Sequence, residues 1–246
     1  MDKLIYTAMT GARQIMDQQS TVANNLANVG TNGFREQIDT FRAVPVPGQG
    51  LDTRTQVVSE TSGSNLTQGV LKQTGRNLDV AIEGQGWFSV MAADGQEAYT
   101  RAGDFKVSSN GVLQTQTGEA VLGENGPITI PDDTPVMFGK DGTVSALVPG
   151  VNPSTMDVLG RLKLVNPPAN SMQRREDGLF KVQPGQVVEA DLAVTVQGGA
   201  LEESNVNTVD AMVRMISLGR QFEMQMDLLK NAEGNATKAS QIMNLN

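Results

Sequence analysis

The first thirty residues carry apolar or small side chains at alternating steps of three and four. These positions are Ile5, Ala8, Ala12, Ile15, Val22, Leu26 and Val29. Gln19 is the one polar interruption, and the spacing places the series along one narrow face of an α-helix. Gly30 and Gly33 flank Thr31 and Asn32, a combination typical of a turn. The helix is therefore predicted to end near residue 30.

A second helical pattern occupies the other end of the chain, from about Val206 toward Asn246. Ser204 and Asn205 precede it, and both residue types commonly cap a helix N-terminus. Its apolar positions recur at steps of seven, with a partner row at the alternate positions, as in a heptad seam. The first row is Met215, Phe222, Leu229, Ala236 and Met243, and the partner row is Met212, Gly219 and Met226. Both terminal stripes are too narrow to enclose a core, so each helix is expected to need a partner.

Between these helices the apolar period changes to two. Short runs rich in Val and Ile, such as residues 78–82, 87–90 and 161–165, are separated by Asp-Gly and Asn-Gly turns. This alternation predicts β-hairpins in an all-β domain, either a sandwich or a partly open barrel.

The whole layout predicts an α+β fold in which N- and C-terminal coiled-coil-like helices flank an inserted all-β domain. Residues 1–33 form the N-terminal helix of an assembly core, and residues 196–246 form its C-terminal helix. Residues 76–195 form the β-rich outer domain. Residues 34–75, with Pro45 and Pro47, fit neither period and are expected to be an extended, weakly packed connector.

Composition excludes several classes of chemistry. The 246 residues contain no Cys and no His, which rules out thiol nucleophiles, disulfides, His general bases and Cys/His metal sites. The net charge is −8 and no basic block occurs, which argues against a nucleic-acid groove. We find no apolar run long enough to cross a bilayer and no cleavable secretory signal at the N-terminus.

The remaining candidates for chemistry are weak. Residues 84–86 (GQG) lie between two strand-like runs, so a tight turn is favoured over a phosphate loop. The acidic pairs 132–133, 176–177 and 202–203 lie beside turn or cap signals and are interpreted as solvated turns, because adjacent residues do not face each other across a cleft. We expect neither a catalytic residue nor a cofactor nor a metal.

Two side-chain types point to contacts with protein. The methionines of the C-terminal helix are interpreted as part of a fixed packing seam, with a flexible recognition surface as the less favoured alternative. Asn24, Asn25 and Asn28 are costly together in one helical region, so their amides are expected to bond across an interface. A fraying helix end is the alternative.

Four segments resemble, in order, the signatures of the bacterial flagellar axial proteins, the family of rod, hook and hook-associated subunits. They are residues 24–34 (NNLANVGTNGF), 78–88 (LDVAIEGQGWF), 99–105 (YTRAGDF), and 204–207 (SNVN) followed by 220–223 (RQFE). Asn32 stands where the family often has Pro. Residues 1–9, 41–48 and 222–226 are most similar to those of a proximal-rod subunit.

The resemblance implies a structural subunit of the proximal rod of the flagellar basal body, which polymerises through its terminal helices and carries motor torque across the periplasm to the hook. It implies export by the flagellar type III apparatus without a cleaved signal, and assembly with copies of itself and with other rod subunits. Nucleic acid, small-molecule substrates and integral membrane insertion are not expected. The alternatives are a distal-rod or other axial subunit, a periplasmic carbohydrate-active enzyme, and a trimeric adhesin-like module.

The residues expected at the assembly interface combine the two helical stripes with the signature segments. They are Ile5, Ala8, Ile15, Val22, Asn24, Asn25, Leu26, Asn28, Gly33, Phe34, Ser204, Asn205, Val206, Asn207, Met212, Met215, Phe222, Met226, Leu229 and Met243.

Overall fold

The computed structural model describes residues 2–45, 55–131, 134–147, 156–183 and 188–243. The chain divides into two compact units, each built from separated segments. Unit 1 comprises residues 1–28, 37–65 and 206–246, and unit 2 comprises residues 29–36 and 66–205. The chain therefore passes between the units four times, and the two ends of the sequence belong to the same unit.

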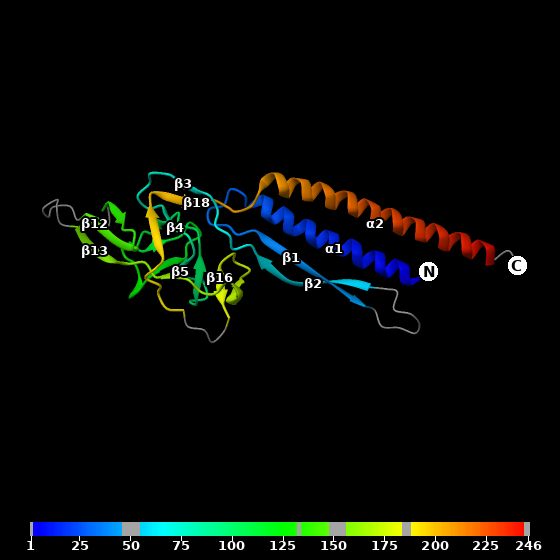
Figure 1. Ribbon diagram of the computed structural model, residues 1–246, viewed down its shortest axis with the longest axis horizontal. Coiled ribbons are helices and arrows are strands. Elements are labelled where there is room, and N and C mark those ends of the chain that lie inside the picture. Colours follow the sequence, from blue (N-terminus) through cyan, green and yellow to red (C-terminus); the bar gives the residue numbers. More distant parts are fainter. Residues whose placement is uncertain (1, 46–54, 132–133, 148–155, 184–187, 244–246) are drawn as a thin grey trace. The chain divides into compact units, whose positions relative to one another are not determined.

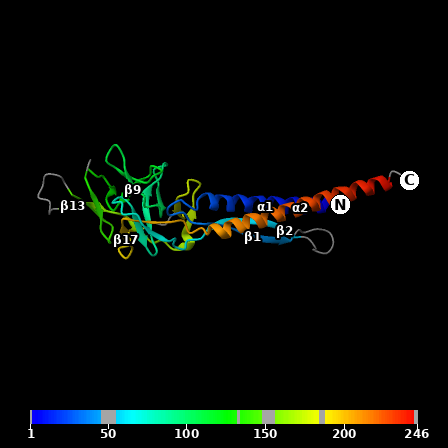
Figure 2. The same ribbon diagram turned by 90° about the horizontal axis from the view of Figure 1, so that it is seen from above.

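Unit 1 contains both long helices, α1 (Asp2–Ala27) and α2 (Thr208–Met243). They lie side by side and run antiparallel (Figures 1 and 2). A Cβ placed on Gly11 would lie 3.6 Å from the side chain of Gln225, so these two residues lie opposite each other in the helix pair. The predicted α+β arrangement, with terminal helices flanking an inserted β domain, is confirmed.

The contact between the helices follows a 3-4 spacing on each of them. In α1 the buried positions are Ala8, Ala12 and Ile15, and in α2 they are Ala211, Leu218 and Ala232. Met215, Phe222 and Leu229 are half-buried between the buried positions of α2. The predicted row through Met215 therefore belongs to the seam, but its partner row is one residue earlier than predicted, through Ala211 and Leu218.

Unit 1 also contains a β-hairpin within the segment for which the sequence suggests an extended connector. Strand β1 (Gln37–Pro45) pairs antiparallel with β2 (Thr55–Ser64), and a register shift between Ile38 and Thr40 marks a bulge. Both strands contact α1. The alternation of apolar and polar residues in β1 is short and broken by this bulge, which is why the period of two is hard to read from the sequence.

Unit 2 is built from short antiparallel strands. Its strands are β3 (Leu71–Gln73), β4 (Val80–Glu83), β5 (Trp87–Met91), β6 (Glu97–Thr100), β7 (Lys106–Val107), β8 (Leu113–Gln114), β9 (Ala120–Gly123), β10 (Gly126–Pro127), β11 (Val136–Phe138), β12 (Thr143–Leu147), β13 (Met156–Arg161), β14 (Leu164–Val165), β15 (Met172–Arg174), β16 (Phe180–Val182), β17 (Thr195–Gly198) and β18 (Ala200–Glu202). A short 3₁₀ helix spans Ala169–Ser171.

The main sheet of unit 2 has the order β15-β16-β6-β5-β9-β8-β7, with β10 on β9 and β14 on β5. A three-stranded sheet has the order β11-β12-β13. The first and last strands of the unit pair with each other, β3 with β18 and β4 with β17. This pairing closes the unit through residues that are more than a hundred positions apart in the sequence.

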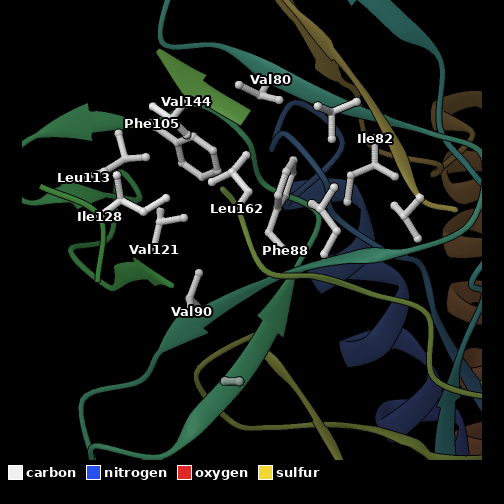
Figure 3. Close-up of a cluster of buried hydrophobic side chains, with 14 of the residues drawn as sticks. Val80, Ile82, Phe88, Val90, Phe105, Leu113, Val121, Ile128, Val144 and Leu162 are labelled. Carbon is white, nitrogen blue, oxygen red and sulfur yellow. The ribbon is translucent and has the colours of Figure 1, made fainter. Parts of the chain in front are cut away.

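A single large apolar cluster fills unit 2 (Figure 3). The rings of Phe88 and Phe105 meet edge to face at its centre, 5.3 Å apart, and Leu162 lies beside them. A smaller cluster contains Trp87, Tyr99, Val165 and Phe180. The alternating pattern predicted these strands because one face of each is directed into this core.

The turn between β4 and β5 is tight, as residues 84–86 predict. Gly84 and Gly86 have φ of 80° and 137°, which side chains rarely adopt. A Cβ on Gly86 would also lie 2.6 Å from Val194. Since a strand and not a helix follows, the turn lacks the helix N-terminus of a phosphate loop.

Candidate assembly surface

A row of exposed methionines runs along each helix of unit 1, directly beside the seam, with the half-buried Gly219 between Met212 and Met226. Each member of the row follows a seam residue in the sequence, so it is rotated by about 100° from the seam around its helix. Met9 and Met16 form the row on α1, seven residues apart. Met212, Gly219 and Met226 form the row on α2, at the same spacing.

The two rows lie on the same face of the helix pair. On each helix, the residue that follows a seam position points away from the contact between the helices. Because the helices are antiparallel, this step points to the same side of the pair on both of them. The exposed fractions are 54% for Met9, 57% for Met16, 49% for Met212 and 38% for Met226. We refer to these four residues and Gly219 as the methionine face.

This result corrects the position of the seam between the two helices, while a packing seam of the methionines with a neighbouring molecule stays a prediction. Met215 is part of the seam, but Met212 and Met226 are exposed, and so is Met224. The correction follows from the one-residue shift of the seam, because a shift of one position moves a whole heptad row to the neighbouring face. Val209, Val213 and Ile216 extend the exposed apolar surface around the first turns of α2.

The other face of the helix pair forms a groove with β1, of about 320 Å³. Residues that precede seam positions line it, such as Thr21 on α1 and Arg214 and Ser217 on α2. Residues that precede seam positions lie on the opposite side of the helix pair from residues that follow them, so the groove and the methionine face are on opposite sides. The groove side has polar side chains beside Val22 and Leu218, and the methionine side has the exposed methionines together with charged residues such as Arg13 and Glu223.

Asn25 attaches β1 to α1 in this groove. Its Nδ2 donates to the backbone oxygen of Gln37 at 2.9 Å, and its Oδ1 accepts from the backbone nitrogen of Gln37 at 2.9 Å. The side chain is buried, and it bonds to the backbone of Gln37 in the way that a neighbouring strand would. Asn28 donates its Nδ2 to the backbone oxygen of Asn24 at 2.9 Å, one helical turn away. The expectation that these amides bond across an interface is therefore wrong for Asn25 and for this bond of Asn28.

Asn205 has a similar role in unit 2. Its Oδ1 accepts from the backbone nitrogen of Glu36 at 2.7 Å, and its Nδ2 donates to the backbone oxygen of Thr67 at 2.9 Å. Asn207, not the predicted pair Ser204 and Asn205, caps α2. The Oδ1 of Asn207 accepts from the backbone nitrogens of Val209 and Asp210, at 3.0 and 3.3 Å. Asn205 is unsuited to the cap because its amide already binds the backbones of Glu36 and Thr67.

Gly33 and Phe34 also hold unit 2 together. The nitrogen of Gly33 donates to the backbone oxygen of Glu202 at 2.7 Å, and a Cβ on Gly33 would lie 2.3 Å from the backbone of Ala102. Phe34 is buried, with the guanidinium of Arg174 4.5 Å from its ring centre. The signature residues around position 33 thus have an internal packing role in addition to any role between molecules.

A buried charge cluster joins the start and the end of unit 2. Glu202 pairs with Arg35 at 2.6 Å and with Arg101 at 2.9 Å, and all three side chains are almost fully buried. The backbone nitrogen of Gly69 donates to Glu202 at 2.7 Å. Both guanidinium groups lie over the ring of Trp87, at 5.8 and 5.6 Å from its centre. The interpretation of residues 202–203 as a solvated turn is therefore wrong for Glu202.

The cluster sets two guanidinium groups against the single carboxylate of Glu202. Burial lowers the pKa of Arg101 to about 10, against the opposing effect of Glu202, so Arg101 is charged at neutral pH. The alternation in β18, with Ala200 and Glu202 directed inward, is the one signal that could have placed Glu202 inside. Two-residue periodicity is weak evidence in a three-residue strand.

The remaining expected interface residues divide among several environments. Ala8, Ile15, Phe222 and Leu229 belong to the seam, Val22 lines the groove, Val206 is buried, Leu26 and Ser204 are half-buried, and Asn24 is exposed. The side chains of Ile5 and Met243 lie outside the described part of the structure. The sequence therefore identified a mixture of internal and exposed positions as one interface.

Two further observations limit the chemistry of the described residues. Among them we find no group of three or more acidic residues that could hold a metal ion. None of the helices in the described ranges combines the length and the apolar character needed to span a membrane.

Comparison with known proteins gives consistent matches along the chain. Residues 5–35 match the model described as "Flagella basal body rod protein", residues 81–146 match "Flagellar hook protein FlgE/F/G D1 domain", and residues 197–242 match "Flagellar basal body rod FlgEFG protein C-terminal". The first and third segments contain most of α1 and most of α2.

Full-length relatives agree with these matches. The chain is 46% identical to the flagellar basal-body rod protein FlgF of Salmonella typhimurium and 45% identical to FlgF of Escherichia coli K12, with all of each chain covered. It is 30% identical to the flagellar basal-body rod protein FlgG of Buchnera aphidicola from Acyrthosiphon pisum, over 97% of this chain and 98% of the relative.

Proposed function

Because the chain belongs to the flagellar basal-body rod protein family, we propose that it is a subunit of the proximal rod that assembles through its terminal helices and transmits torque. The chain is a structural subunit of the rod and assembles with other rod subunits. The finer parts of the proposal are the proximal position, self-association, passage across the periplasm, and export through the flagellar type III apparatus without a cleaved signal.

The observation that carries the proposal is the exposed apolar surface of unit 1. Four methionines, with Val209, Val213 and Ile216, remain in solvent on helices whose other faces are occupied by the seam and the hairpin. Such a surface on a monomer favours an interaction site. A neighbouring subunit that covers it would complete the burial of both helices and connect them mechanically.

The relatives distinguish the two rod positions only in part. Those with the highest identity are FlgF proteins, and FlgG proteins match at about 30%. This order supports the proximal-rod assignment that the sequence segments favour over a distal-rod subunit. The chain is structural rather than enzymatic: its relatives are rod proteins, and Glu202 is fully engaged with two arginines. These relatives favour a rod subunit over the enzyme and over the adhesin-like module.

The test uses charge on the exposed surface, away from the seam. Val213→Glu together with Ile216→Glu should prevent incorporation into basal bodies and abolish swimming, because two carboxylates would be buried without partners at the contact. The variant is expressed in a bacterium whose own copy of the corresponding rod gene is deleted. Swimming and the amount of the chain in purified basal bodies are measured.

A matched control is available on the same helix. Asn231→Glu with Asn235→Glu adds the same charge at exposed polar positions and should leave swimming intact. Circular dichroism of both purified variants checks that α1 and α2 still form. Normal swimming of the Val213/Ile216 variant would contradict the proposal. Phe222 and Leu229 are unsuitable for this test, since they belong to the seam within the molecule.

A further inference from the structure

We propose that the methionine face is a redox-sensitive modification site, at which hydrogen peroxide converts methionine to the sulfoxide and blocks assembly of the free subunit. The proposal rests on the proposed function, because it assigns a regulatory property to the same surface. The four residues concerned are Met9, Met16, Met212 and Met226.

Accessibility makes these side chains open to oxidation, and their place on one side of the helix pair distinguishes them from other exposed methionines such as Met137 and Met224. The sequence contains no Cys, so thioethers are the most readily oxidised groups of the chain. The one Trp is almost fully buried, whereas each of the four methionines exposes more than a third of its surface. Met215, which lies in the seam, is more protected.

The chemistry is a two-electron oxygen transfer. A lone pair of the thioether sulfur attacks one oxygen of hydrogen peroxide, an S–O bond forms and the O–O bond breaks. The sulfur is oxidised from thioether to sulfoxide, and the peroxide is reduced, with proton transfer to the departing oxygen, to one molecule of water. Methionine sulfoxide reductases reverse the change, so the modification is a switch rather than permanent damage.

The position of the sulfurs determines the consequence. A sulfoxide is polar, and burying it against an apolar neighbour without a hydrogen bond is unfavourable. At Gly219 a Cβ would meet no atom within 4 Å, so the surface between Met212 and Met226 is open to an approaching helix. Oxidation on both sides of this opening would place polar groups where close helix contact requires apolar ones.

The helix pair itself should survive oxidation. Its buried contact positions are Ala8, Ala12, Ile15, Ala211, Leu218 and Ala232, and none of these contains sulfur. The modification therefore acts on contacts between molecules and not on the fold of unit 1. Once a neighbour covers the face, its sulfurs are shielded, so the sensitive species is the unassembled subunit.

The experiment compares association of the full-length protein before and after peroxide. Purified protein is treated with hydrogen peroxide, the peroxide is removed with catalase, and oxidation at each methionine is measured by peptide mass spectrometry. Sedimentation velocity over a range of concentrations then reports association, and circular dichroism reports helix content. We expect association to weaken at least about tenfold after oxidation with helix content unchanged.

Two Leu-substituted variants make the test specific. In the first, Met9, Met16, Met212 and Met226 are replaced by Leu, which keeps the surface apolar and cannot be oxidised; it should associate equally well with and without peroxide. In the second, Met91, Met137 and Met156 of unit 2, which are also exposed, are replaced by Leu. This variant should remain as sensitive as the natural sequence.

The outcomes separate the two proposals. Unchanged association of the oxidised natural protein, or equal peroxide sensitivity in the first Leu variant, would overturn the redox inference while leaving the proposed function in place. Absence of association in the reduced natural protein and in the first Leu variant would overturn self-assembly, and the inference with it. Sensitivity that disappears only in the first variant supports the inference.

Discussion

The two units of this chain bury their apolar residues in opposite ways. Unit 2 surrounds one large cluster, in which Phe88, Phe105 and Leu113 are fully buried. Unit 1 has only a thin seam, made largely of alanines, and leaves Met9, Met16, Val209, Val213 and Ile216 in solvent. Both units come from the same chain and have the same solvent around them. Their difference therefore concerns what each is built to contact.

Polar groups differ between the units in the same sense. Unit 2 buries an ion cluster whose members all lie within the unit, since Glu202 pairs with both Arg35 and Arg101. Unit 1 places the buried amide of Asn25 on the hairpin side and has exposed methionines on the other side. A unit that buries its apolar core and its charge cluster internally is suited to be a rigid body, whereas a unit with exposed apolar residues on one side is suited to be joined by another molecule.

The largest predicted effect comes from removing the carboxylate charge of Glu202 in unit 2. Glu202→Gln keeps the shape of the side chain but leaves two buried guanidinium groups without a carboxylate. We expect the free energy of unfolding of unit 2 to fall by about 3–5 kcal/mol. Urea unfolding followed by the fluorescence of Trp87, which lies against both arginines, measures the change.

The neighbouring residue supplies the control. Glu203 pairs with Lys72 at 3.4 Å, and both side chains are exposed. Glu203→Gln should change the free energy of unfolding by no more than about 0.5 kcal/mol. Equal effects of the two substitutions would mean that the Glu202 cluster is not the structural centre of unit 2.

The second prediction concerns how unit 1 holds its hairpin. Asn25→Ala removes both hydrogen bonds to Gln37 and leaves that backbone without its side-chain partner. We expect β1 to be destabilised by about 2 kcal/mol, seen as faster hydrogen exchange of the Gln37 amide, with the fluorescence of Trp87 unchanged. Asn24→Ala is the control, since the Asn24 side chain is exposed. Slow exchange at Gln37 in the Asn25 variant would show that the hairpin is held by other contacts.

The sequence predicts the plan of the molecule well because strong periodic patterns specify it. The helix in α1, most of the extent of α2 and the strands around Phe88 all follow from spacing and turn residues. The seam of α2 shows the limit of this reasoning. Rows beginning at Ala211 and at Met212 both start with apolar or small residues, and only the position of α1 decides which of them is covered. Hydrophobicity alone favours the larger methionines, and the structure uses the alanines because small residues let the helices approach closely.

The partners of Glu202 and of Asn25 were mispredicted for a related physical reason. The roles of both residues depend on partners far away in the sequence, Arg101 for one and the backbone of Gln37 for the other. The sequence around an acidic pair next to a helix start indicates a solvated turn. The sequence around an asparagine in a helix does not identify the partner of its amide, which only the tertiary contacts show. Residues that bind backbone groups or buried charges leave no periodic signal.

The smallest predicted effect appears only at alkaline pH and distinguishes the two tyrosines, one in each unit. Burial, and secondarily Glu97, raises the pKa of Tyr99 to about 12. An unfolded tyrosine ionises near pH 10, so between about pH 10 and 12 the unfolded chain has lost a proton that folded unit 2 retains. The free energy of unfolding therefore falls as the pH rises through this window, and below it Tyr99 has no such effect.

Tyr99→Phe keeps the ring in its cluster and removes the ionisation, so it should flatten this alkaline decline by on the order of 1–2 kcal/mol at pH 11.5 relative to pH 9. Arg101, whose pKa is lowered to about 10, contributes with the opposite sign in the same range, but it is present in both proteins and cancels in their difference. Tyr6→Phe is the control, because Tyr6 is 66% exposed on α1. Urea unfolding at the two pH values measures the effect. If both substitutions flatten the decline equally, burial does not distinguish the tyrosines, and the contrast between a self-contained unit 2 and an open unit 1 would lose one of its supports.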